Sequence, residues 1–245
     1  MNTLKFANGL PQLFEDFPRS DHPRNRCFSR LLGALPGLAS ENKLMLLNHA
    51  ASHLAGNEVY LEIGAWFGLS IIAAALGNRR TAFVTIDDFS EFGGSSSLLQ
   101  RNLARFHVAD HVAVIEADCF RLLRLRQPFG QRTVGVFFYD GCHTFDAQLQ
   151  VLQLIKRHLS DRALIVIDDT SNPAVRGAIA HYTSFQPEYE LLFDIPTNRD
   201  RDPRWWNGIQ AFSFRRARAR RHGRLLPALH QQWIGAATWP GSTRT

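Results

Sequence analysis

The sequence predicts an α/β protein built on one mostly parallel sheet with helices on both of its faces. Short, continuous apolar runs of strand length alternate with amphipathic stretches of helical length, which is typical of parallel strands covered on both sides. The chain has 245 residues, of which 45% are hydrophobic, enough to bury one large core. A carboxylate follows nearly every apolar run, at the edge of the sheet where ligands of such folds bind.

Seven strands are expected, at residues 59–63, 82–86, 112–116, 134–139, 163–167, 189–195 and 208–214. The last two are joined by a polar, aromatic loop and predict an antiparallel β-hairpin that closes one edge. Helices are expected from the N-cap Ser40 to about Leu54, from about Ser70, near 98–107, over 144–159, and from Asn172-Pro173 to about Phe185. The arrangement is Rossmann-like.

Composition divides the chain into three parts. Residues 1–39 mix proline, arginine and aromatic residues without a sustained period and predict a cap or lid segment. Residues 40–214 form the predicted main domain, and residues 215–245 form a basic tail. The tail holds seven arginines and no acidic residue, so of the total net charge of +6 the rest of the chain carries −1. This distribution argues against a nucleic-acid-binding core.

Three scattered cysteines exclude a disulfide framework, and no CxxC pair suggests zinc. No apolar run approaches the length of a membrane span, and no basic start precedes an apolar segment. These features favour a cytoplasmic protein without a membrane span.

The carboxylates at the strand ends are the candidate functional residues: Glu62, Asp87, Asp88, Asp118, Asp140, Asp168 and Asp169. Each one alone also fits the cap of a following helix. Capping does not explain the set, because random placement would seldom put an acid at each strand end.

The first strand runs into a turn that carries Gly64 and Gly68. Glycine lets the backbone of a strand-to-helix turn approach a ligand closely. The loop lacks the GxGxxG spacing of a pyrophosphate site. Asp87, 23 residues beyond Gly64 at the next strand end, can accept hydrogen bonds from ribose hydroxyls. Together these residues predict a site for an adenosine-containing ligand.

The segment Glu62-Ile63-Gly64-Ala65-Trp66-Phe67-Gly68-Leu69-Ser70 resembles the cofactor loop of class I S-adenosylmethionine-dependent methyltransferases. It is most similar to that of catechol O-methyltransferase-like and related small-molecule and sugar O-methyltransferases. The resemblance covers roughly residues 40–179. It implies that the methionine end and the rest of the cofactor are bound by Glu62, Gly64, Ala65, Trp66, Gly68, Ser70, Asp87, Asp118 and Asp140, with Asp87 at the ribose and Asp118 near the adenine.

In the metal-dependent members, an Asp after the fourth strand and an acidic pair after the fifth bind a divalent ion. The resemblance places these ligands at Asp140, Asp168 and Asp169. Three converging carboxylates repel one another unless a cation joins them, and hard oxygen ligands suit Mg²⁺ or another divalent cation. Such an ion would activate and orient an acceptor hydroxyl.

His143, three residues beyond Asp140, is the candidate general base, although it also fits a helix cap or an adenine contact. Cys142 stands where the sugar-modifying branch often has a second Asp, and we interpret it as small packing. Trp205 and Trp206 fit either a substrate wall or the core under the hairpin.

The sequence therefore predicts a metal-dependent O-methyltransferase that acts on a sugar or phenolic hydroxyl of a small molecule, in natural product biosynthesis. A metal-independent methyltransferase and an RNA-associated protein that uses its arginine tail stay open as alternatives. A NAD-dependent oxidoreductase is disfavoured by the loop. A homo-oligomer is neither indicated nor excluded.

Overall fold

The computed structural model describes residues 1–198 and 201–217. Its centre is a seven-stranded sheet in the order β3-β2-β1-β4-β5-β7-β6. The strands are β1 Glu58–Ile63, β2 Ala82–Asp87, β3 Val112–Glu116, β4 Thr133–Tyr139, β5 Leu159–Asp168, β6 Tyr189–Ile195 and β7 Ile209–Arg215. The strands β1 to β5 pair in parallel, whereas β7 pairs antiparallel with both β5 and β6. The predicted mixed sheet and its C-terminal hairpin are confirmed.

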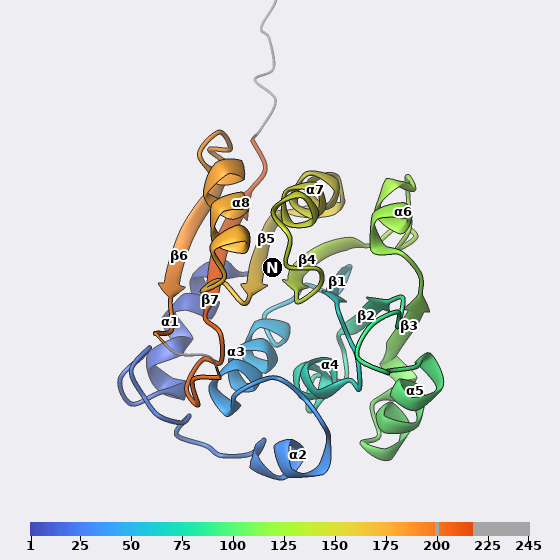
Figure 1. Cartoon of the computed structure of the whole chain (residues 1–245), viewed down its shortest axis with the longest axis vertical. Helices are drawn as coiled ribbons and strands as arrows, with labels where there is room; N and C mark the ends of the chain where they lie inside the picture. Colours follow the sequence, from blue (N-terminus) through green and yellow to red (C-terminus); the bar gives the residue numbers. More distant parts are fainter. Residues whose placement is uncertain (199–200, 218–245) are drawn as a thin grey trace, which may run out of the picture.

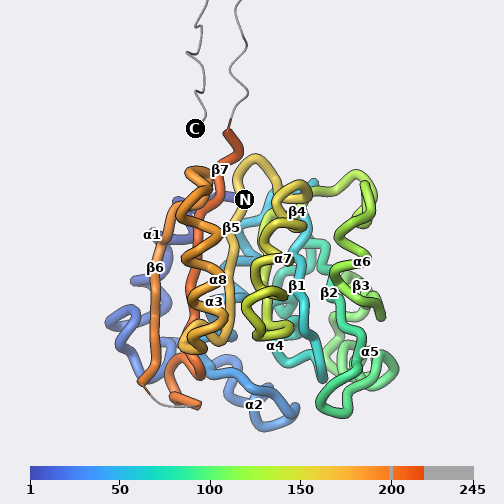
Figure 2. Tube along the Cα trace, turned by 45° about the horizontal axis from the view of Figure 1, so that its top comes forward, coloured from blue at the N-terminus to red at the C-terminus, as the bar shows by residue number. Residues whose placement is uncertain are grey.

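Helices cover both faces of the sheet (Figure 1). One face carries α1 Thr3–Leu13, α2 Ser29–Ala34, α3 Glu41–Ala51, α4 Leu69–Ala75 and α5 Ser96–Arg105. The other carries α6 Cys119–Arg124, α7 Phe145–Ile155 and α8 Pro173–Thr183. Short 3₁₀ turns occur at Ala109–His111 and Lys156–His158. In Figure 2, α7 and α8 lie in front of the central strands, while α1 lies beside the β6–β7 edge.

Alternation along the strands separates the two cores. On β1, Val59, Leu61 and Ile63 pack towards α7, whereas Tyr60 packs with the helices of the opposite face. Successive strand side chains point to opposite faces, so a strand that is buried on both sides reads as one continuous apolar run. This is why the sequence pattern locates the central strands well.

The N-terminal segment is part of the main core. Phe6, Leu10 and Phe14 of α1 and its C-cap are buried in the same cluster as the sheet residues. Trp205 is also buried there, and its Nε1 donates a hydrogen bond to the carbonyl of Pro18. Two locations were predicted for the Trp205 side chain. The structure places it in the core under the hairpin and not in the cavity wall.

Two predicted boundaries and one omission need correction. The helix predicted over 144–159 ends at Ile155, and Leu159 starts β5, where it pairs with Val134. A buried leucine satisfies the helical and the strand pattern equally, so the pattern did not separate them. The helix that starts at Ser40 ends at Ala51, well before Gly56. The short helix α6 was not predicted.

None of the helices in the described ranges has the length and apolar composition needed to span a lipid bilayer. The predicted arginine-rich tail lies outside the described residues from residue 218 onward.

Candidate active site

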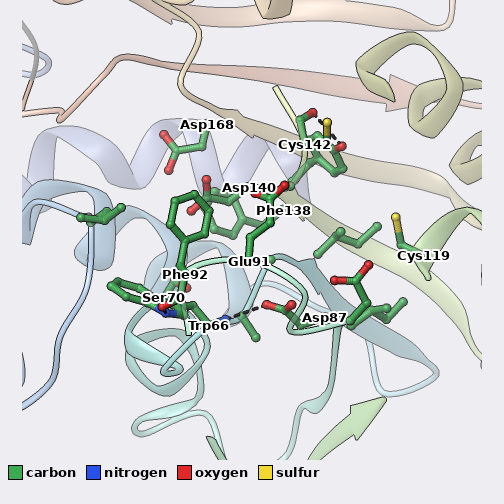
Figure 3. A pocket seen from close by; sticks show the side chains of 18 of the residues that line it. Trp66, Ser70, Asp87, Glu91, Phe92, Cys119, Phe138, Asp140, Cys142 and Asp168 are labelled. Carbon is green, nitrogen blue, oxygen red and sulfur yellow. Dashed lines mark hydrogen bonds between the residues drawn. The ribbon is translucent and has the colours of Figure 1, made fainter. Parts of the chain in front are cut away.

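A cavity of about 740 Å³ lies at the carboxyl ends of the parallel strands. This is within the range of about 300–1,000 Å³ that is usual for small-molecule sites. Its walls come from the loops that follow β1, β2, β3, β4 and β5, and from residues 36–39 and Lys43. Figure 3 shows Asp87 and Cys119 on one side of this cavity and Asp168 on another, with Asp140 between them. The strand-end carboxylates after β2, β3, β4 and β5 that the sequence singled out therefore share one cavity.

The two loop glycines serve the packing of the protein. Gly64 has φ +94°, and a Cβ there would lie 2.0 Å from the carbonyl oxygen of Asp140. Gly68 has φ +91°, and its Cβ would lie 2.4 Å from Leu99 Cδ1. We expected glycine to make room for a ligand. The absent Cβ atoms make room for the neighbouring loop and for α5, and the close approach of a ligand to this turn stays a prediction.

Asp87 links two loops through their backbones. One carboxylate oxygen accepts a hydrogen bond from Trp66 N at 2.8 Å and the other accepts one from Phe89 N, also at 2.8 Å. Trp66 Nε1 donates to the carbonyl of Phe92 at 3.0 Å. The dashed line in Figure 3 marks the Trp66–Asp87 bond. Each carboxylate oxygen has a second lone pair, so the predicted ribose contact stays compatible with these bonds.

Glu62 lies beneath the glycine loop and is fully buried. Its Oε1 accepts a hydrogen bond from Ser70 Oγ at 2.9 Å, whereas its Oε2 has no partner. Burial raises the pKa of Glu62 well above its usual range. A buried oxygen without a partner costs free energy unless a ligand supplies a donor.

Asp118 caps helix α6, with its Oδ1 accepting from Phe120 N at 2.8 Å and Arg121 N at 3.3 Å. The capping alternative thus applies at this position, although Asp118 also lines the cavity. Ala65 lines the cavity too and is 3% exposed.

Asp140, His143 and Asp169 form a compact cluster at the centre of the site. One potential ligand atom from each lies within 4.8 Å of the other two. His143 Nε2 is 3.1 Å from Asp169 Oδ2 and 3.7 Å from Asp140 Oδ1, yet this buried atom makes no well-directed hydrogen bond. Asp169 has φ +53°, a left-handed conformation that is uncommon for residues other than glycine.

Asp168 has a different environment from its neighbour. Its Oδ1 forms an ion pair with Lys43 Nζ and accepts a hydrogen bond from Asp169 N at 2.7 Å. Both side chains of the ion pair are almost completely buried, at 1% and 2% exposure. The ligand role predicted for Asp168 stays a prediction, since the group of mutually close ligand atoms found among the described residues comprises Asp140, His143 and Asp169.

Opposing charges set the protonation of the cluster. Burial raises the pKa of Asp140, and His143 opposes that change. Burial also raises the pKa of Asp168, against the effect of the Lys43 ammonium. The interaction with Asp140 raises the pKa of His143 above its ordinary value. The site therefore places the Lys43 ammonium, and the His143 imidazole that is a cation only when protonated, among several carboxylates.

Two residues of the cavity wall, Lys43 and Phe92, were not predicted, and Cys142 differs from its prediction. Lys43 belongs to the first turn of α3 and was not among the predicted site residues. Phe92 is 73% exposed in a loop with no recognisable motif. Cys142 was interpreted as packing, but it is exposed and lines the cavity. The described residues of the 196–207 loop, which are 196–198 and 201–207, do not line this cavity.

The chain was compared with known proteins. Residues 61–170 match the model of a family described as a methyltransferase domain. No curated protein matches the chain. Among solved structures, cofactor-bound Rv0187 from MTB is 21% identical with a TM-score of 0.59, covering 78% of this chain and 89% of that one. The S-adenosylmethionine complex of the O-methyltransferase TomG from Streptomyces achromogenes, involved in tomaymycin synthesis, is 18% identical with a TM-score of 0.57, covering 87% and 96%. An O-methyltransferase from Bacillus cereus in complex with SAH is 16% identical with a TM-score of 0.57, covering 84% and 97%.

These likenesses show the fold, which is that of class I S-adenosylmethionine-dependent methyltransferases. The matched residues run from within β1 to just past β5 and include most of the cavity wall. The chain therefore has the class I methyltransferase fold, and its residues 61–170 match a methyltransferase domain.

Proposed function

We propose that the protein is a divalent-metal-dependent O-methyltransferase that transfers the methyl group of S-adenosylmethionine to a hydroxyl of a small molecule. The observation that carries the proposal is the Asp140–His143–Asp169 cluster in the same cavity as the glycine loop. A methyl acceptor bound at this cluster would face a cofactor bound along the loop.

The cofactor end of the site uses the loop between β1 and α4 together with Asp87. The unpartnered Oε2 of Glu62 supplies a buried acceptor beneath the loop. Asp87 offers its second lone pairs to ribose hydroxyls, and Asp118 and Cys119 lie on the side proposed for the adenine. Ala65, Trp66 and Ser70 complete this wall.

The cluster suits a divalent ion. Asp140 and Asp169 offer two carboxylates whose oxygens lie within reach of one ion. Mg²⁺ is commonly held by one or two carboxylates and keeps several waters. When bound, the ion would lower the pKa of an acceptor hydroxyl and orient its oxygen.

His143 is the proposed general base. Its Nε2 faces both carboxylates, and the residue lines the cavity. In its neutral form this nitrogen accepts the proton of the acceptor hydroxyl, and the two carboxylates stabilise the imidazolium that results. The reaction is an in-line displacement, so alignment of the hydroxyl oxygen with the cofactor methyl supplies much of the rate.

The acceptor we propose is a sugar or phenolic hydroxyl of a secondary metabolite. Trp66 and Phe92 place aromatic surface at the cavity, which suits a flat ring or a sugar face. TomG, which has the same fold, acts in tomaymycin synthesis.

A panel of phenols and sugars, with formation of S-adenosylhomocysteine as the readout, tests the proposal. We expect turnover that stops in excess EDTA and returns with Mg²⁺ or Mn²⁺. Asp169→Asn should remove the metal-dependent activity, whereas Asp161→Asn, which changes a 91% exposed carboxylate, should not. Absence of S-adenosylmethionine binding by calorimetry would contradict the whole proposal.

A metal-independent methyltransferase is the second candidate, and the Lys43–Asp168 ion pair favours it. The Lys43 ammonium already offsets part of the acidic charge. Full turnover in excess EDTA would support this candidate over the first. The RNA-associated alternative depends on residues outside the described ranges, and a chain that ends at residue 217 tests it by comparison of RNA binding and small-molecule turnover.

A further inference from the structure

Lys43 is buried at an unfavourable position. It is the third residue of α3, where the helix dipole disfavours a positive charge, and its side chain is 1% exposed. A buried ammonium needs a compensating partner. The carboxylate of Asp168, 125 residues further along the chain, supplies this compensation.

The Asp168 oxygen that pairs with Lys43 also accepts a backbone hydrogen bond. Asp168 Oδ1 accepts the backbone N–H of Asp169, the residue with φ +53°. A left-handed conformation outside glycine persists only when surrounding contacts hold it. This conformation is the one in which Asp169 Oδ2 comes within 3.1 Å of His143 Nε2.

The first turn of α3 is itself firmly anchored. Ser40 Oγ accepts from Lys43 N at 3.2 Å and donates to the carbonyl of Arg204 at 2.6 Å. Asn42 Nδ2 donates to the carbonyl of Ser20 at 2.8 Å. Glu41 pairs with Arg26 at 2.9 Å. The Lys43 ammonium therefore reaches Asp168 from a fixed position on α3, on the sheet face that also carries α4.

We propose that Lys43 and Asp168 are positioning residues: Lys43 neutralises Asp168, and Asp168 serves as a backbone anchor that aims Asp169 at His143 and Asp140. Asp168 then acts as an anchor rather than as a ligand of the cluster. This proposal rests on the proposed function only where it involves a bound divalent ion. The conformation of Asp169 is observed independently of any ion.

Two charge-neutral double variants separate an anchor from a ligand. Lys43→Met/Asp168→Asn keeps an oxygen that accepts the Asp169 N–H, whereas Lys43→Met/Asp168→Leu removes it at similar side-chain size. Binding of Mn²⁺ by electron paramagnetic resonance and of S-adenosylhomocysteine by calorimetry are measured for both. Lys156→Met, which breaks an ion pair with Glu188 outside the cavity, is the control.

We expect the Asn double variant to bind Mn²⁺ within about threefold of the wild type. The Leu double variant should bind it about 10–100-fold more weakly, as is usual when an outer partner of a metal ligand is lost. Affinity for S-adenosylhomocysteine should stay within about threefold in both, since its predicted contacts lie mainly along the glycine loop. Equal loss of Mn²⁺ in both double variants would make Asp168 a ligand, and wild-type affinity in both would remove the anchoring role.

The single variant Lys43→Met tests the neutralising role. It leaves a third uncompensated carboxylate beside the cluster, so we expect a lower melting temperature and a larger stabilisation by Mn²⁺ than in the wild type. An unchanged melting temperature and an unchanged Mn²⁺ shift would overturn this role.

Crystal structures of the two double variants give a readout that needs neither metal nor turnover. Asp169 should keep a positive φ in the Asn double variant and leave that region in the Leu double variant. If the wild type binds no Mn²⁺, the metal of the proposed function fails, while the anchor proposal is still decided by this angle. A positive φ in both structures would overturn it.

Discussion

His143 Nε2 lies between the carboxylates of Asp169 and Asp140, so its proton is held more tightly than in water. Its pKa is raised above the ordinary value of about 6.5. The protonated imidazole stabilises the folded protein below that pH, and this contribution disappears as the pH rises through the raised pKa. A general base at this position works only above that same pKa.

For the acceptor found in the panel, kcat/KM should rise with pH as His143 loses its proton, and should level off once the imidazole is neutral. His143→Gln should lower it by roughly 10²–10⁴-fold and remove this inflection. The measurement is a pH–rate profile of both proteins under saturating S-adenosylmethionine. His181→Gln on α8, outside the cavity, is the control. A persistent inflection in His143→Gln would assign the base to another group.

At the scale of the element, the turn between β1 and α4 depends on the loop after β4. Gly64 lies so close to the backbone of Asp140 that a Cβ atom would come within 2.0 Å of the Asp140 carbonyl oxygen. Gly77, at the end of α4, has φ +81° and nothing within 4 Å of its Cβ position. The two glycines therefore share the conformational constraint but differ in the space around them.

Gly77→Ala should cost about 1–2 kcal/mol, the price of a left-handed conformation for alanine. Gly64→Ala should cost clearly more, because it also displaces the Asp140 carbonyl, and it should weaken S-adenosylhomocysteine binding, whereas Gly77→Ala should not. Urea unfolding and calorimetry measure both effects. Equal costs would show that the Asp140 loop yields to a methyl group without resistance.

The elements differ in how far the sequence predicts them. The central strands and the N-caps Ser40 and Asn172 follow from local patterns, and the structure has them. The helix α6 has six residues, too few for a periodic signal. Lys43 was invisible because its burial depends on a partner 125 residues away, and no local pattern records such a pair.

At the scale of the whole molecule, residues 1–39 do more than cover the cavity, because part of the segment belongs to the hydrophobic core. Only residues 36–39 of this segment line the cavity, whereas Phe6 and Phe14 are fully buried in the main core. Phe14 contacts Phe17 and Trp205 through ring pairs with centroids 5.4 Å and 5.7 Å apart. The segment therefore combines a structural part with a short stretch at the site.

Phe14→Ala should destabilise the protein by about 3–5 kcal/mol, the usual cost of such a cavity. Affinity for S-adenosylhomocysteine in the remaining folded protein should not change, because Phe14 does not line the cavity. Chemical denaturation measures the first effect and calorimetry the second. Phe185→Ala, at a side chain that is 75% exposed, is the control. A cost no larger than that of Phe185→Ala would mean that α1 packs only loosely.

The ion pair between Lys43 and Asp168 also orders events during synthesis. Lys43 leaves the ribosome long before Asp168, so this ion pair cannot form until β5 has been synthesised. The native compensation of the Lys43 ammonium by Asp168 is therefore a late contact in the making of the chain. Completion of the catalytic end of the protein is thereby coupled to the arrival of its fifth strand.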